Sequence, residues 1–151
     1  MSKIAFIFPG QGAQTCGMGK DFYEQTETGK RVFDKASELL GFSMPQLCFE
    51  QNDRLDITEY TQAAMVTTSI AMMEVLEERG IKPDVAAGLS LGEYCALAAS
   101  GVMSAENAIR TVRQRGILMQ EAVPVGEGAM AAILALDASA IEAVTGAMEG
   151  V

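Results

Sequence analysis

The sequence contains no histidine among its 151 residues and has few basic side chains. Serine and cysteine nucleophiles are usually activated by a histidine base, and this chain supplies none. Eleven lysines and arginines stand against 20 aspartates and glutamates, giving a net charge of −9. Nucleic acids and anionic membranes are bound by basic surfaces, so this balance argues against both partners. An anionic ligand would need a basic pocket built locally.

Cysteines and long apolar runs are scarce as well. The three cysteines, Cys16, Cys48 and Cys95, are far apart and odd in number, so they indicate neither a disulfide framework nor a Cys-x-x-Cys pair. We expect them to be small buried apolar side chains. No apolar stretch reaches the ~20 residues of a membrane span, and the N-terminal segment lacks a signal-peptide core. The sequence therefore predicts a cytoplasmic protein with no membrane partner.

The composition is that of a globular domain, with 49% hydrophobic and 21% charged residues. Two short apolar segments, 3–8 and 85–89, are predicted to be buried strands of a parallel sheet. Helices are expected over 20–40 in one or two pieces, 58–79, 91–100 and 104–122, the last with Ser104 as its N-cap. This alternation of strands and helices predicts an α/β fold.

A composition break at 124–128 predicts the start of a second lobe. Beyond it, residues 129–136 are predicted to form a third strand. Ser139 and Glu142 are predicted to form a capping box that begins a last short helix.

The predicted strands are too few for a complete sheet. Typical sheets have ~5 to 6 strands, and a parallel sheet must be covered on both faces. We therefore expect residues 1–124 and 125–151 to be the first parts of two lobes of a longer protein, whose C-terminal half is missing here.

Residues 87–101, AGLSLGEYCALAASG, place a serine where a predicted strand meets a predicted helix. Ser90 lies between Gly88 and Gly92 in a G-x-S-x-G pattern, which is typical of a sharp turn that exposes a strained serine nucleophile. The glycines are expected because close neighbours leave no room for side chains. The helix N-terminus directs N–H groups at a developing oxyanion, and the Leu91 N–H is the expected first donor.

The segment 8–19, FPGQGAQTCGMG, is a glycine-rich loop directly after the first predicted strand. It fails two phosphate-binding patterns, because Thr15 replaces a required glycine and Met18 replaces a required lysine. Loops that follow parallel strands open at the same edge of the sheet, so this loop can meet the serine turn. A backbone N–H near Gln11 is then the expected second oxyanion donor. A plain strand-to-helix turn is the alternative.

Arg115 borders the apolar stripe of the helix predicted at 104–122, whereas Arg110 lies opposite. Arg115 can therefore reach inward, where a buried guanidinium usually needs a carboxylate partner. An aspartate, a glutamate or a substrate can supply that carboxylate, and the residues alone leave these alternatives open.

Three segments occur in order: FPGQGAQ, GLSLGEYCALAASG and RGILMQEAVP. With them, the chain resembles the malonyl-CoA:acyl carrier protein transacylases from residue 1 to about residue 148. The resemblance implies an α/β-hydrolase-like subdomain and a small ferredoxin-like subdomain inserted from about residue 125. It also implies transfer of a malonyl group from malonyl-CoA to acyl carrier protein in fatty-acid biosynthesis, with no cofactor or metal beyond the coenzyme A thioester.

The resemblance also assigns the site residues: the nucleophile Ser90, the backbone oxyanion donors Gln11 and Leu91, and the malonyl-binding Arg115. Leu89 stands where many members have a histidine, but that position is not the base. The family's catalytic histidine lies beyond Val151, which would explain why the present chain has none. We therefore expect the 151-residue chain alone to be inactive.

Two other functions remain open. A serine hydrolase or thioesterase would use the same turn with water as the acceptor, but a hydrolase of neutral esters has no use for a cation in its pocket. A non-catalytic fragment or interaction module would carry a serine that is never acylated.

Overall fold

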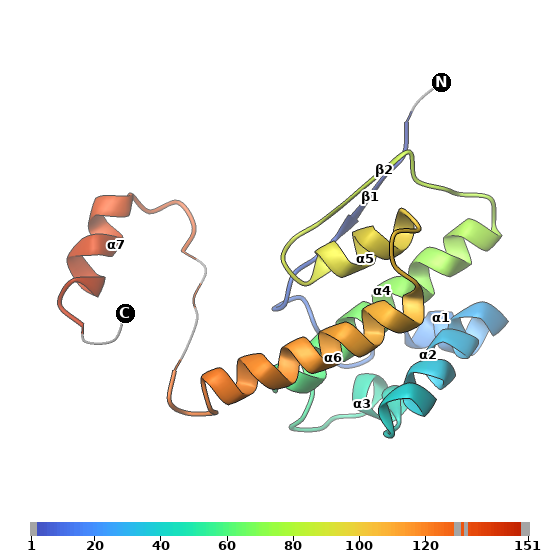
Figure 1. The fold of residues 1–151 in the computed structure, drawn as a ribbon, viewed down its shortest axis with the longest axis horizontal. Helices are drawn as coiled ribbons and strands as arrows, with labels where there is room; N and C mark the ends of the chain where they lie inside the picture. The colour runs from blue at the N-terminus through green and yellow to red at the C-terminus, as the bar shows by residue number, and fades with distance from the viewer. Residues whose placement is uncertain (1–2, 129–130, 132, 149–151) are drawn as a thin grey trace.

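The computed structural model describes residues 3–128, 131 and 133–148 (Figure 1). The elements of this part of the chain are β1 (Ala5–Phe8), α1 (Lys20–Gln25), α2 (Glu27–Leu40), α3 (Met44–Phe49), α4 (Thr58–Glu78), β2 (Val85–Gly88), α5 (Gly92–Ala99), α6 (Ala105–Ala122) and α7 (Ala138–Thr145). The two strands pair in parallel, with Ala5 opposite Val85 and Phe8 opposite Gly88. The predicted α/β class is therefore confirmed.

Helix α4 forms the centre of the fold, packed against α2, α5 and α6 (Figure 1). Its buried residues run from Thr61 to Val75 and include almost every position between them. A helix that is buried on all sides needs no polar face, which explains its Ala-, Met- and Thr-rich sequence. Neither α4 nor any other described helix combines the length and the apolar character that crossing a membrane requires.

The two strands are more exposed than predicted. Helix α5 lies against both of them, yet Ile7 is 78% exposed and Val85 is 54% exposed. The prediction of buried strands is wrong for the described residues, because their sheet holds only two strands and much of it has no covering element.

Helix ends follow local side chains. The predicted helix over 20–40 is divided at Thr26, whose hydroxyl caps α2. Helix α3, which we did not predict, is capped by Ser43 and has Pro45 in its first turn. The predicted N-cap of α6 is confirmed: the Ser104 hydroxyl accepts a hydrogen bond from the Asn107 backbone N–H at 3.2 Å.

The C-terminal segment departs from two predictions. Of the strand predicted over 129–136, residues 129, 130 and 132 lie outside the described residues, and the described ones form no strand. The predicted capping box is also wrong, because α7 begins one residue before Ser139 and is preceded by Asp137, which makes no side-chain cap. Helix α7 buries no side chain and lies away from the other helices (Figure 1). The proposed two-lobe division remains a prediction.

The cysteines divide into two environments. Cys48 and Cys95 are buried as expected, but Cys16 is exposed, which corrects the prediction for that residue. Burial raises the pKa of the Cys48 and Cys95 thiols to about 12 in each case. Both therefore remain neutral at physiological pH and behave as small apolar side chains.

Candidate active site

Ser90 lies in the turn between β2 and α5, as the G-x-S-x-G pattern predicts. Its φ of +49° places a non-glycine residue in the left-handed region. Such a conformation costs about 1–3 kcal/mol and persists only where the surrounding structure enforces it. The side chain is exposed, so its hydroxyl is accessible to a ligand.

The flanking glycines allow this turn to close. A Cβ atom added to Gly88 would overlap the backbone of Gly92, and one added to Gly92 would overlap the carbonyl of Phe8. Both obstacles are backbone atoms, so neither can move without displacing α5 or β1. The predicted steric reason for the two glycines is therefore confirmed.

The glycine-rich loop after β1 meets the serine turn. The Leu89 N–H donates to the Phe8 carbonyl at 3.1 Å, and a Cβ on Gly10 would lie 3.1 Å from the Leu89 carbonyl oxygen. Within the described part of the chain, the backbone N–H groups of Gln11 and Leu91 donate to no protein acceptor. The structure thus leaves an unpaired donor in each of the two segments that meet here.

Arg115 of α6 reaches the serine directly. Its Nη2 donates to the Ser90 Oγ at 3.1 Å, and its Cζ lies 5.9 Å from the centre of the Tyr94 ring. The side chain is half-buried and, among the residues described here, makes no ion pair. Its remaining N–H groups are available for a carboxylate. Neither an aspartate nor a glutamate of the described residues is its partner.

A neighbouring arginine fixes α6 to α4. The Arg113 guanidinium contacts the Glu59 carboxylate at 2.8 Å and donates to the Glu59 carbonyl at 2.6 Å. Gly116 faces the same residue so closely that a Cβ there would lie 2.8 Å from the Glu59 Cα. We did not predict this contact, although a glycine inside a long helix is a recognised sign of close backbone approach.

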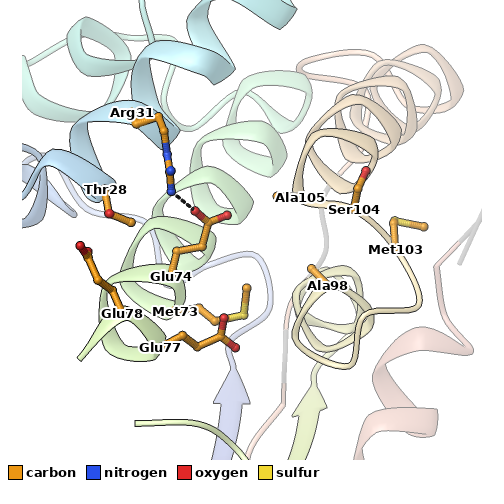
Figure 2. A pocket seen from close by; sticks show the side chains of 10 residues that line it. All are labelled: Thr28, Arg31, Met73, Glu74, Glu77, Glu78, Ala98, Met103, Ser104 and Ala105. Atoms are coloured by element: carbon orange, nitrogen blue, oxygen red, sulfur yellow. Dashed lines mark hydrogen bonds and ion pairs between the residues drawn. The ribbon is translucent and has the colours of Figure 1, made fainter. Parts of the chain in front are cut away.

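A separate cavity of about 560 Å³ has neither Ser90 nor Arg115 in its lining (Figure 2). It is lined by residues of α2, α4 and α5 and of the segment leading into α6, and Figure 2 shows the ion pair between Arg31 and Glu74 at its side. Glu77 and Glu78 add two further carboxylates. Because acidic groups outnumber the single arginine, this cavity is unsuited to an anionic substrate.

Residues 5–149 match the family model described as acyl transferase domain. The chain belongs to this family. It is 56% identical over 146 residues to a malonyl CoA-acyl carrier protein transacylase of Bacillus subtilis, covering 96% of this chain and 46% of the relative. The predicted resemblance is confirmed at this level.

Solved structures give the same relationship. It superimposes on the malonyl CoA-acyl carrier protein transacylase of Coxiella burnetii with a TM-score of 0.86 and 43% identity, covering 95% of this chain and 46% of that one. A complex of a type II PKS acyl-carrier protein with its malonyl-transacylase gives a TM-score of 0.85 at 42% identity, covering 94% and 47%. The chain spans about half the length of the curated relatives it matches.

Proposed function

We propose that this acyltransferase chain is the nucleophile-bearing half of an enzyme that moves a malonyl group from malonyl-CoA to the phosphopantetheine thiol of acyl carrier protein. The names of its relatives support the substrates. The observation that carries the proposal is the 3.1 Å contact between the Arg115 guanidinium and the Ser90 hydroxyl. It places a cation beside the atom that would receive the acyl group. A malonyl group, unlike an acetyl group, carries a free carboxylate that can bind this cation.

In the proposed first step, the Ser90 Oγ attacks the thioester carbonyl carbon of malonyl-CoA. A base takes the serine proton, and the carbonyl oxygen becomes an oxyanion held by the backbone N–H groups of Gln11 and Leu91. The C–S bond then breaks, and the base returns the proton to the leaving coenzyme A sulfur. Arg115 pairs with the free malonyl carboxylate during this step.

The second step reverses the chemistry with a different thiol. The base takes the proton of the phosphopantetheine thiol of acyl carrier protein, and the sulfur attacks the malonyl–serine ester. The bond between the acyl carbon and the Ser90 oxygen breaks, and that oxygen leaves with the proton from the base. The coenzyme A thioester is a substrate, so the proposed cycle uses no additional cofactor.

The base is the part of this proposal that the chain does not contain. All 151 residues lack histidine, and we propose that the base is a histidine in the region of the relatives that this chain does not match. The exposed strand residues of the described sheet, with Ile7 78% exposed, support a further proposal. The missing region would complete the α/β-hydrolase-like sheet and the ferredoxin-like lobe.

The test uses a hybrid enzyme in which residues 1–148 of this chain are joined to the part of the Bacillus subtilis relative that the chain does not match. We expect malonyl-CoA to increase the intact mass of this protein by one malonyl group and to release free coenzyme A. The Ser90→Ala variant should show no increase. A mass increase that persists in this variant would place the acylated residue elsewhere.

The acceptor distinguishes the remaining functions. Transfer to acyl carrier protein that is faster than release of free malonate supports the transacylase. Release of malonate without thiol transfer would indicate a hydrolase or thioesterase, and no acylation of the hybrid would indicate a non-catalytic protein.

A further inference from the structure

Gln62 of α4 is a fully buried polar side chain close to the proposed oxyanion loop. Gln62 is 0% exposed and lies within the apolar core. Within the described part of the chain its Oε1 accepts no hydrogen bond. A buried acceptor without a hydrogen bond lowers the stability of the fold. We therefore ask which contacts of the Gln62 N–H groups compensate for this cost.

The Gln62 amide holds the Gln11 side chain. Its Nε2 donates to the Gln11 Oε1 at 3.1 Å, and the Gln11 Nε2 in turn donates to the Thr58 Oγ1 at 3.1 Å. Thr58 and Gln62 are one helical turn apart and therefore lie on the same face of α4. Together they hold the oxygen and the nitrogen of the Gln11 side-chain amide. The Gln11 side chain is thus tied to α4, whereas its backbone N–H donates to no acceptor among the described residues.

The same amide contacts the helix that carries Arg115. The Gln62 Nε2 lies 3.2 Å from the Met119 sulfur, and Met119 follows Arg115 by one turn of α6. Helices α4 and α6 lie side by side there (Figure 1). One buried side chain thus links the oxyanion loop to the helix with the carboxylate-binding arginine.

We infer that Gln62 is a positioning residue that fixes the Gln11 backbone N–H for oxyanion stabilisation, through its hydrogen bond to the Gln11 side chain. This inference rests on the proposed function. Gln62 touches no reacting atom in this scheme. Its effect is on the transition state, because a donor displaced by a fraction of an ångström still allows substrate to bind.

The test compares Gln62→Met, Gln11→Ala and the double variant in the hybrid enzyme. Methionine keeps the volume of glutamine but cannot donate to Gln11. We expect each single variant to lower kcat for acyl-enzyme formation about 10- to 100-fold, with KM for malonyl-CoA changed less than about threefold. Because both act through one contact, the double variant should be no slower than the slower single variant.

Two further variants separate positioning from a general structural effect. Gln62→Leu removes both polar atoms of the amide and cannot donate to Gln11, so it should be as slow as Gln62→Met. Thr67→Val removes a different buried polar group of α4, a hydroxyl without a hydrogen-bond partner among the described residues and without a hydrogen bond to Gln11. We expect it to leave kcat unchanged.

A second measurement does not depend on turnover. Hydrogen exchange of the loop peptide around Gln11 should be faster in Gln62→Met than in the parent hybrid and unchanged in Thr67→Val. Unchanged exchange in Gln62→Met, or losses in kcat that multiply in the double variant, would overturn the inference. Failure of the parent hybrid to form an acyl-enzyme would instead overturn the proposed function.

Discussion

Replacing Arg115 by alanine in the hybrid enzyme tests whether this arginine selects the malonyl group. Its Nη2 is 3.1 Å from the Ser90 Oγ, so the guanidinium adjoins any acyl group attached to the serine. A carboxylate on that acyl group can accept two charge-assisted hydrogen bonds from the fork of an arginine. Acetyl has no carboxylate and forms neither bond.

The size of the effect follows from the exposure of this site. Hydrogen bonds to charged groups contribute about 1.5–3 kcal/mol each, and the half-buried position of Arg115 reduces the sum because water screens the pair. We therefore expect a loss of about 2–4 kcal/mol for malonyl. This corresponds to about a 30- to 1000-fold lower kcat/KM, and acetyl loading should change less than about threefold.

The assay follows coenzyme A release from malonyl-CoA and from acetyl-CoA under single-turnover conditions. Arg110→Ala is the matched control, because it removes the same charge from an exposed position on α6. It should leave the ratio of malonyl to acetyl loading unchanged. Equal losses for both substrates in Arg115→Ala would refute the reasoning and assign the arginine a structural role.

Three further predictions concern packing, pH and the isolated chain. Gly116→Ala should lower the Tm of the hybrid, because the added Cβ would lie 2.8 Å from the Glu59 Cα. This overlap costs about 1–3 kcal/mol, against a gain of ~1 kcal/mol in helix propensity. An unchanged Tm would contradict this prediction. The buried thiols of Cys48 and Cys95, with pKa values of about 12, keep their protons when folded but lose them near pH 8.5 when unfolded. Their contribution to stability is therefore complete below pH 8.5 and lost as the pH rises toward 12. The urea midpoint of unfolding should therefore be lower at pH 10.5 than at pH 8. The difference between the two midpoints should be smaller in Cys95→Ala, which lacks one of the two thiols. The 151-residue chain alone should show no sustained malonyl transfer and should associate in sedimentation; turnover within tenfold of the hybrid would mean that it contains its own base.

The serine turn could be predicted from sequence because its chemistry is local. Ser90 is enclosed by Gly88 and Gly92, and each glycine is required by a backbone atom that lies within a few residues or on the paired strand. The contact of Arg115 with that serine was harder to predict. A helical wheel indicates that Arg115 can reach inward, but its contact with Ser90 depends on the packing of α6 against α4 and α5.

The burial of the strands and the role of Gln62 depend on distant parts of the chain. Apolar strands such as β1 are typical of a buried sheet, but their actual burial requires neighbours that the described residues do not provide. Gln62 was missed because one glutamine in a long helix has no distinctive pattern. Its role arises from Gln11, which is 51 positions away. Helix α3 was missed although Ser43 and Pro45 are ordinary signals of a helix start.

The pairing of β1 with β2 has a consequence for synthesis of the protein. Ala5 pairs with Val85, so β2, the partner of the first strand among the described residues, is made only after about 80 further residues. At a translation rate of about 5–20 residues per second, this interval lasts roughly 4 to 16 s. During that time the segment around Phe6 and Ile7 is an unpaired apolar strand next to a growing chain. Chaperone binding during translation would therefore be concentrated at the N-terminus and should end when β2 leaves the ribosome.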